Sequence, residues 1–494
     1  MSARGRRTLG HRSPVHRLAR RSLGPVAVVA QSVGAIAPTA AMVTTPALIA
    51  AGAGAGAVWS ALIGSLAVLL VASAITVFAR RMAAPGSLYA FVAQGLGPAW
   101  AFGAGCALLV GYACVSVASF GGSALYLASL AEDLGLPSGP GVHVAVVLAV
   151  AAAVGVLVLR GVRTASVVLV GLEVLAVAVI VGVVGQLLAL PGGRLPLADL
   201  APARLDVSAV AAGVVTAVVA FIGFESSTSL APEVRRPLSV LPRALTWTVV
   251  GTSVLFVVGT YAVVGAFIRT GVDPAAAAMP VDELVVASGI TMPGPLLDLA
   301  AATSFIACTL ASTTALVRLL FAMGTERMAP AALGATHPRF RTPHVALAVS
   351  LPALAALAAV PVALGVPVRR LMDTAISVSV LGYVLCYVLV CLAVRPFLTR
   401  IGERTPGPVA GSLVAAVVLG TTFVVFAARA VLTDPVVPAV FAATLALGAG
   451  WYGRKRAREP HDTAGIGVFD QTSTDDVLWH LPDRQDRPAD PDAA

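Results

Sequence analysis

The most informative stretch of the sequence is VTAVVAFIGFESSTSLAPEVRRPLSVLPRAL, residues 215–245. It begins as an apolar run and then reads FIGFESS at residues 221–227, where a glycine, an acid and two hydroxyls interrupt it. A carboxylate at membrane depth is costly and usually faces a cavity or a partner, so Glu225 marks a functional site. Gly223 lowers the cost of opening the helix there. The stretch predicts a broken membrane helix that lines a binding site; the alternative is an intact helix with one paired Glu.

Composition indicates an integral membrane protein. The chain has 494 residues, of which 58% are hydrophobic and 12% charged, whereas soluble domains carry about 25% charged residues. The net charge of +9 is no sign of nucleic-acid binding, because the basic residues fall in short clusters between apolar spans. The five cysteines lie inside apolar runs without metal-ligand spacing, so we expect small core residues and neither a metal site nor a cofactor.

Twelve apolar runs are long enough to cross a bilayer as helices. They lie near residues 25–50, 57–79, 98–130, 142–159, 166–190, 208–231, 245–268, 295–323, 344–364, 371–394, 408–429 and 435–452. If the N-terminus is inside, 27 of the 33 basic residues fall on the inner side, which predicts that both termini are cytoplasmic. Residues 1–24 read as a basic cytoplasmic arm, and residues 453–494 as a disordered cytoplasmic tail.

The first and sixth spans are interrupted at corresponding positions. QSVGAIAPTAAM at residues 31–42 contains Gly34 and Pro38, and proline removes a backbone donor in mid-membrane. The two spans are equivalent if spans one to five and six to ten are repeats, and an odd number of spans per repeat forces opposite orientations. Paired interruptions of this kind indicate the substrate site of a transporter.

With these features the sequence resembles the amino acid–polyamine–organocation superfamily of permeases, specifically bacterial amino acid permeases. Residues 221–245 resemble its sixth-helix pattern of aromatic-x-Gly-Phe-Glu and a later Pro-Arg-Ala. APGSLYAFVAQGLGP at residues 84–98 resembles the loop after the second helix of the family. VRLLFAMGTERMAP at residues 317–330 resembles the cytoplasmic end of the family's eighth helix. Ser87 and Pro232 depart from the usual residues of the family.

The resemblance implies an all-α integral membrane protein with a five-plus-five inverted repeat and two extra C-terminal helices. We expect a transporter domain at residues 25–452, with repeats at about 25–190 and 208–394 and the extra helices at about 408–452. The implied function is transport of amino acids or related organic amines across the bacterial cytoplasmic membrane, by proton-coupled symport or exchange. A sodium-coupled symporter of the same fold is the alternative.

The opened helices supply the predicted substrate site. Half-helix N-termini favour a carboxylate and exposed carbonyls favour an ammonium group, so the backbone itself can hold a zwitterion. The alternative is two kinked packing helices. The predicted substrate-binding residues are Gly34, Ala35, Ile36, Ala37, Tyr112, Phe221, Ile222, Gly223 and Phe224.

Several polar side chains are candidates for coupling or gating. Glu225 either carries a coupling proton or is a structural hydrogen-bond hub, and Glu233 with Arg235 and Arg236 forms either a cytoplasmic gate or a solvated charge cluster. A possible sodium site comprises Thr309, Ser312 and Thr313, although such hydroxyls also pack helices in lipid.

Glu173 is the other deep acid, and the expected interpretation is a structural pair with Arg160 or Arg163. A membrane enzyme or sensor is the alternative class of protein. HExxH, a nucleophile elbow and a Walker motif are missing from the sequence, so we expect no enzyme.

The predicted topology is testable by labelling. Cysteines placed in a background without the five native ones should react with an impermeant maleimide from outside at residues 271–277 but not at residues 237–240. Outside labelling of the second segment in intact cells would overturn the inside position of the termini.

Overall fold

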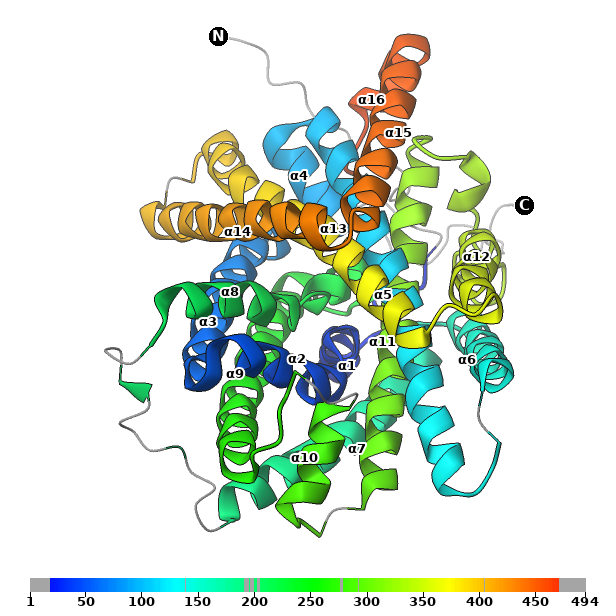
Figure 1. The fold of residues 1–494 in the computed structure, drawn as a ribbon. Coiled ribbons are helices and arrows are strands. Elements are labelled where there is room, and N and C mark those ends of the chain that lie inside the picture. Colours follow the sequence, from blue (N-terminus) through cyan, green and yellow to red (C-terminus); the bar gives the residue numbers. More distant parts are fainter. Residues whose placement is uncertain are drawn as a thin grey trace, which may run out of the picture.

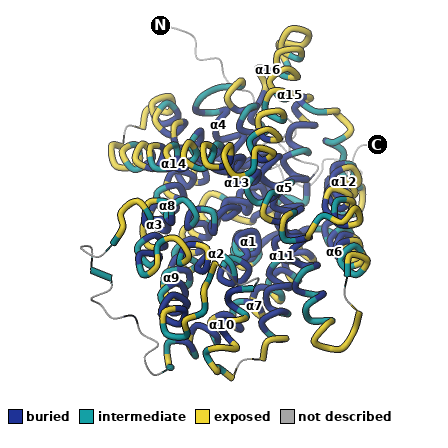
Figure 2. The backbone as a smooth tube through the Cα atoms, in the orientation of Figure 1, coloured by how far each residue is buried: buried dark blue, intermediate teal, exposed yellow. Residues whose placement is uncertain are grey.

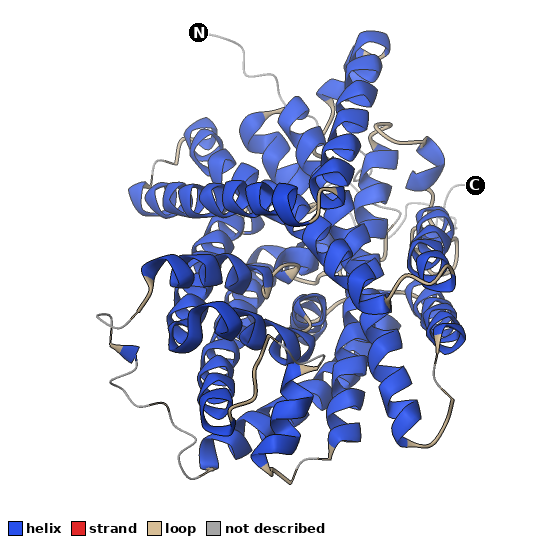
Figure 3. Ribbon diagram, viewed as in Figure 1, coloured by secondary structure: helices blue, strands red, loops and turns tan. Residues whose placement is uncertain are grey.

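The structure is a computed structural model that describes residues 18–137, 139–190, 195, 200–201, 205–275, 279–291, 293–403 and 405–470. Within these ranges the chain is all-helical, with one isolated bridge between Leu23 and Val234 (Figures 1 and 3). Eleven helical stretches of the described chain are long and apolar enough to cross a membrane, and the first, Pro25–Ala79, covers two of the twelve predicted spans. The predicted fold class is confirmed. Residues 1–17 of the arm and 471–494 of the tail lie outside the described residues.

The first half of the bundle supplies spans one to five. It consists of α1 (Pro25–Ile36), α2 (Pro38–Ala53), the short η1 (Gly54–Gly56), α3 (Ala57–Ala79), α4 (Leu88–Leu96), α5 (Pro98–Asp133), α6 (Pro140–Arg160) and α7 (Val162–Ala189). α1 and α2 together form the broken first span. Proline is the first residue of α1, α2, α5 and α6, where its missing N–H is not needed because the first N–H groups of a helix have no intrahelical partner.

The second half repeats this order. It consists of α8 (Val207–Val219), η4 (Phe224–Glu233), α9 (Pro237–Thr270), α10 (Pro280–Ser288), α11 (Gly294–Thr325), η5 (Ala331–Gly334), α12 (His344–Ala363) and α13 (Val368–Ile401). The short helices α4 and α10 follow the second and seventh spans. Spans in corresponding positions contact each other, namely α2 with α8, α3 with α9, α5 with α11, and α6 with α12. The first four spans of each half therefore contact their counterparts in the other half.

α5 and α13 cross closely in the interior, and this crossing positions the site. A Cβ added at Gly382 of α13 would collide with the Ala107 carbonyl oxygen of α5, and the Ser379 hydroxyl donates to the Gly111 carbonyl at 2.9 Å. Small residues let helix backbones approach in a membrane, where packing holds helices together. The crossing brings Tyr112 of α5 and Tyr383 of α13 into edge-on contact.

Two further helices lie at the periphery. α14 (Pro406–Thr433) packs against α3 and α13, and α15 (Val436–Arg458) packs against α5 and α13. Much of their surface is exposed, whereas α5, α11 and α13 are largely buried (Figure 2). These are the two extra helices that the sequence predicts.

The chain beyond α15 is ordered further than predicted. α15 continues to Arg458, the short α16 (Pro460–Ala464) follows, and residues 465–470, here called the C-terminal strap, pack against the bundle. The N–H groups of Gly467 and Val468 donate to Oε1 of Glu326 at 2.9 and 2.6 Å, and the Tyr89 hydroxyl donates to Oε2. The expectation of disorder is therefore wrong for residues 453–470, because the helices α15 and α16 and the hydrogen bonds of the strap order them.

The end of the strap is anchored to two other segments. The N–H of Asp470 donates to the Ala83 carbonyl at 2.7 Å, directly after α3, and its carboxylate lies 2.9 Å from Nη2 of Arg20. The segment around Arg20 itself bonds to the end of η4, where the Leu23 N–H donates to the Glu233 carbonyl at 2.9 Å. The strap thus joins segments next to α3, α1 and α11 on the predicted cytoplasmic side.

The Glu326 carboxyl should hold the docked strap. Glu326, which lies just beyond the end of α11, is 7% exposed, and it accepts hydrogen bonds from two N–H groups of the strap. Glu326→Ala removes both bonds, so hydrogen exchange should show protection factors of Gly467 and Val468 about tenfold lower than in the wild type. Unchanged protection in the variant would show that other contacts order the strap.

Candidate functional site

The first break lies at Ala37. α1 ends at Ile36, α2 begins at Pro38, and Ala37 between them has the left-handed backbone φ 52°, ψ 64°. The residue before a proline is disfavoured in the helical region, which opens the helix at this point. The Ala37 N–H still donates to the Val33 carbonyl at 3.0 Å, and the Ala37 carbonyl accepts from Ala41 at 2.9 Å. The predicted opening is therefore present, and it is confined to the end of the GAIAP sequence.

The second break lies at Gly223, and it touches the first. α8 ends at Val219, and Gly223 adopts φ +95° before the 3-10 helix η4 begins at Phe224. A Cβ added to Gly223 would lie 2.9 Å from the Ala35 carbonyl oxygen and 3.2 Å from the Ala35 Cβ. Only glycine satisfies both the positive φ and this close approach.

Hydroxyls of the FESS peptide join the two breaks. The Ser32 hydroxyl donates to the Ser227 hydroxyl at 2.7 Å, and the Ser226 hydroxyl donates to the Gln31 carbonyl at 3.1 Å. The side-chain amide of Gln31 donates in turn to the Ala311 carbonyl of α11 at 2.8 Å. The broken spans are therefore fixed to each other and to α11 by hydrogen bonds among buried groups.

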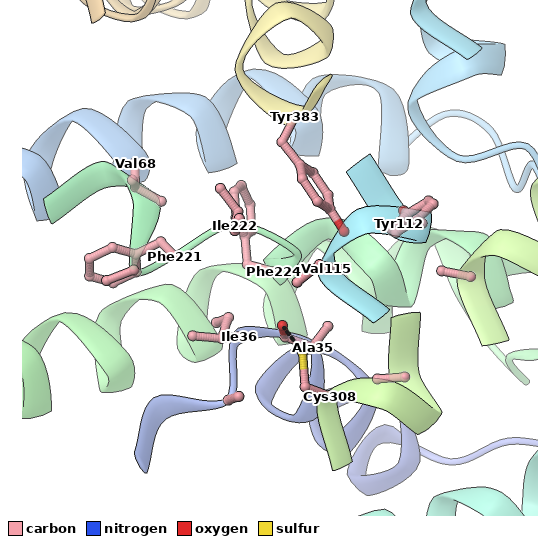
Figure 4. Packing of buried hydrophobic residues seen from close by; sticks show 14 of the residues in the cluster. Ala35, Ile36, Val68, Tyr112, Val115, Phe221, Ile222, Phe224, Cys308 and Tyr383 are labelled. Atoms are coloured by element: carbon pink, nitrogen blue, oxygen red, sulfur yellow. Dashed lines mark hydrogen bonds between the residues drawn. The ribbon is translucent and has the colours of Figure 1, made fainter. Parts of the chain in front are cut away.

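Glu225 lies at the centre of a buried tyrosine cluster. The Tyr112 hydroxyl of α5 donates to Oε1 at 3.0 Å, and the Tyr387 hydroxyl of α13 donates to Oε2. The Gly223 N–H donates to the Tyr387 oxygen at 3.2 Å, so one tyrosine connects the acid to the turn before it. Tyr383 packs edge-on against Tyr112, with ring centroids 5.4 Å apart (Figure 4). Sequence reasoning missed Tyr387, although its spacing of four from Tyr383 puts both on one helix face.

A cavity of about 170 Å³ opens beside the breaks. Of the predicted substrate-binding residues, Ala35, Ile36, Ala37 and Ile222 line it. Other helices contribute Val115, Ala118, Ser119, Tyr126, Phe305, Cys308, Arg369, Met372, Asp373 and Ile376, among others. The Cys308 thiol donates to the Ala35 carbonyl at 3.3 Å, next to the Gly223 contact (Figure 4).

The remaining predicted substrate-binding residues lie behind the cavity wall. A Cβ at Gly34 would meet Leu169 of α7 at 2.9 Å, so Gly34 faces helix packing. Phe221 packs edge-on against Phe256 of α9, and Phe224 lies beside Tyr387. Tyr112 and Gly223 support Glu225 and the break. These residues do not line the cavity, and their contact with a substrate stays a prediction.

The predicted charge cluster is rearranged. Buried Glu233 pairs with Arg318 of α11, whose Nε and Nη2 donate to its two oxygens at 3.0 and 3.2 Å. Arg235 and Arg236 are exposed, and neither is the partner of Glu233. Because Glu233 is buried beside Arg318, the interpretation of Glu233, Arg235 and Arg236 as a solvated charge cluster is wrong. A cytoplasmic gate that contains Glu233 stays a prediction.

The hydroxyls of α11 divide into two groups. Thr309 and Ser312 donate to carbonyls one turn back, Phe305 at 3.0 Å and Cys308 at 2.6 Å, and Ser312 also bonds to Ser116 of α5. The buried hydroxyls of Thr313 and its neighbour Thr314 have no hydrogen-bond partner among the described residues. A hydroxyl that donates its O–H to a carbonyl keeps its oxygen lone pairs, so the predicted sodium site of Thr309, Ser312 and Thr313 stays a prediction.

Glu173 of α7 is buried, and its carboxyl oxygens have no hydrogen-bond partner in the described part of the chain. The expected pairing with Arg160 or Arg163 is wrong. Ten residues separate Arg163 from Glu173 on one helix, which is about 15 Å along the axis and beyond the reach of the two side chains.

Comparison with known proteins shows which family of proteins the chain resembles. The sequence profile of the amino acid permease family matches residues 27–446. The branched-chain amino acid permease BcaP of Bacillus subtilis is 26% identical over 66% of this chain and 72% of its own length. An uncharacterized transporter of Mycobacterium tuberculosis is 30% identical over 64% of this chain and 68% of its own. The low-affinity putrescine importer PlaP of Escherichia coli is 27% identical over 56% and 61%.

The broken first and sixth spans, joined around a cavity in an all-helical bundle, define a multi-pass membrane transporter. The chain belongs to the amino acid permease family, and the resemblance stated from its motifs is confirmed.

The contact between the breaks makes a direct prediction. Gly223→Ala should cost roughly 1–3 kcal/mol of local strain and abolish transport, because the added Cβ meets the Ala35 carbonyl at a positive φ. Gly251→Ala in α9 is the matched control, since a Cβ there meets nothing within 4 Å. Uptake by purified protein in liposomes and the melting temperature would be measured together. Normal uptake by Gly223→Ala would remove this contact from the site.

Proposed function

We propose that this permease is a secondary transporter that carries amino acids with apolar side chains across the bacterial cytoplasmic membrane by alternating access. The observation that carries the proposal is the cavity beside the two breaks. It reaches backbone at Ala35–Ala37 and at Ile222, and its inner wall is formed by small and apolar side chains. Both termini are taken to be cytoplasmic, as the distribution of basic residues predicts.

The backbone of the first break supplies both charges that a zwitterion needs. The last carbonyls of α1 end at the break and attract an ammonium group, whereas the first N–H groups of α2 begin there and attract a carboxylate. α1 and α2 contain no charged residue, so this recognition rests on the helix ends. A substrate placed here directs its side chain toward Val115, Ala118 and Ile222.

The side-chain part of the cavity favours an apolar group over a second amine. Asp373 is the one carboxylate among the lining residues, and it lies 3.8 Å from Arg369, which offsets its charge. A diamine would need an uncompensated carboxylate at its far end. This arrangement supports a substrate like that named for the branched-chain permease more than one like that named for the putrescine importer.

Coupling has two candidate residue sets. We infer proton-coupled symport or exchange through Glu225, which touches both the turn at the second break and two helices of the scaffold. Sodium coupling through Thr309, Ser312 and Thr313 is the second candidate, because their buried hydroxyls offer the oxygen ligands that a hard cation prefers. The buried Glu233–Arg318 pair serves as an inner gate in either case, since it joins the end of η4 to α11.

The substrate class is testable with the cavity itself. Labelled leucine or isoleucine should enter liposomes that contain the purified protein, and unlabelled apolar amino acids should compete while putrescine should not. Ala118→Phe should reduce uptake by more than tenfold because it fills the cavity, whereas Ala152→Phe on the exposed side of α6 should not. Uptake of putrescine in preference to leucine would overturn the proposed substrate class.

The role of Glu225 is testable by one ratio. If its carboxyl carries the coupling proton, Glu225→Gln should stop net uptake driven by a proton gradient and spare exchange of labelled for unlabelled substrate. If Glu225 is a structural hub, the variant weakens the tyrosine cluster and both activities fall together. The ratio of exchange to net uptake, measured in the same liposomes, separates the two. An unchanged ratio would favour sodium coupling or simple exchange.

A further inference from the structure

A second cavity lies on the predicted cytoplasmic face, apart from the substrate site. Its volume is about 500 Å³, and it lies between the end of α3, the start of α9 and the end of the C-terminal strap. Four arginines line it, together with Ser239, Phe469 and Asp470 among others. They are Arg21, Arg81, Arg235 and Arg236, drawn from three separate segments of the chain. None of these four arginines lines the proposed substrate cavity, so binding of the substrate does not explain why they lie together.

The carboxylates near this cavity neutralise only part of its charge. Asp470 pairs with Arg20, and Glu403 pairs with Arg81. Arg81 also donates to the Val77 carbonyl, which fixes it to the end of α3. No carboxylate of the described residues pairs with the other three arginines that line the cavity. The cavity is therefore strongly positive.

The start of α9 adds to this charge. Arg236 is the N-cap of the 34-residue helix, Pro237 is its first residue, and no side chain caps it. The first N–H groups of a long helix carry partial positive charge and bind anions. The guanidinium groups of arginine match the geometry of phosphate oxygens. Together these groups favour an anion with several oxygens, such as a phosphate group, over a monatomic anion such as chloride.

The position of the cavity identifies the source of the phosphate. Leu238, in the first turn of a membrane span, lines the cavity and is 46% exposed, so an apolar surface lies directly beside the arginines. A lipid contacts the arginines with its headgroup and the apolar surface of α9 with its acyl chain. A free phosphate contacts the arginines alone. Basic pockets between membrane helices on the cytoplasmic side bind anionic headgroups in this way.

We propose that this cavity is a binding site for the phosphate of an anionic membrane lipid. The site requires the strap and the segment around Arg21 to lie against the start of α9, so a bound lipid stabilises this docked arrangement of the three segments. The proposal rests on the proposed orientation of the chain but needs no transport activity.

The test uses the full chain in nanodiscs of phosphatidylcholine, with short-chain phosphatidylglycerol added as the probe. The double variant Arg235→Gln/Arg236→Gln should bind phosphatidylglycerol about 30-fold more weakly than the wild type. This is the loss expected when two basic residues beside an anionic lipid lose their charge. Arg243→Gln/Arg395→Gln is the matched control, because it removes the same charge from exposed positions outside the cavity. Binding would be followed by native mass spectrometry and by the rise in melting temperature.

The outcomes separate the explanations. Retained binding in the control and loss in the Arg235/Arg236 variant support the site. Equal loss in both variants would assign the effect to overall charge and overturn the proposed site. If inorganic phosphate raises the melting temperature as much as the lipid does, the cavity binds a soluble anion and the lipid proposal is wrong. If phosphatidylglycerol neither binds nor stabilises the wild type, the proposed site does not exist. If the double variant is misfolded in phosphatidylcholine alone, Arg21→Gln serves instead, and unweakened binding by a folded Arg21→Gln would overturn the site.

Discussion

The close approach of Gly223 to the Ala35 carbonyl is the contact on which the rest of the site depends. It lets two interrupted spans meet at their breaks, which an L-residue at the same φ would prevent. The serines on either side then join the spans, and the Tyr387 hydroxyl connects the turn at Gly223 to Glu225. Without that approach the cavity would lose the backbone that forms its inner end.

The sequence predicted features that are local in the chain. Pro38 and Gly223 are visible as interruptions, and both breaks appear at those points. The twelve spans follow from apolar runs whose length is dictated by the bilayer. These predictions succeed because the responsible residues act on their own backbone.

Partners of buried charges could not be predicted in the same way. Tyr387 lies 162 residues from Glu225, and Arg318 lies 85 residues from Glu233, so only the packing of α13 and α11 against η4 brings them together. Nearness in the sequence grouped Arg235 and Arg236 with Glu233, and Arg160 or Arg163 with Glu173, but in the structure Glu233 pairs with Arg318 and the Glu173 oxygens have no partner among the described residues. The strap was missed for a related reason: its polar residues read as disorder, while the acceptor that orders it, Glu326, is 141 residues away.

The position of the strap along the chain has a consequence for synthesis. Arg20 and Asp470 are separated by 450 residues, with every described membrane span between them. Since a chain emerges from the ribosome in order, the helices insert and pack before the strap exists. During that interval the newly made bundle lacks the tie between its first and eighth spans. A chain interrupted after α15 would therefore contain all the described membrane spans but lack the hydrogen bonds of the strap.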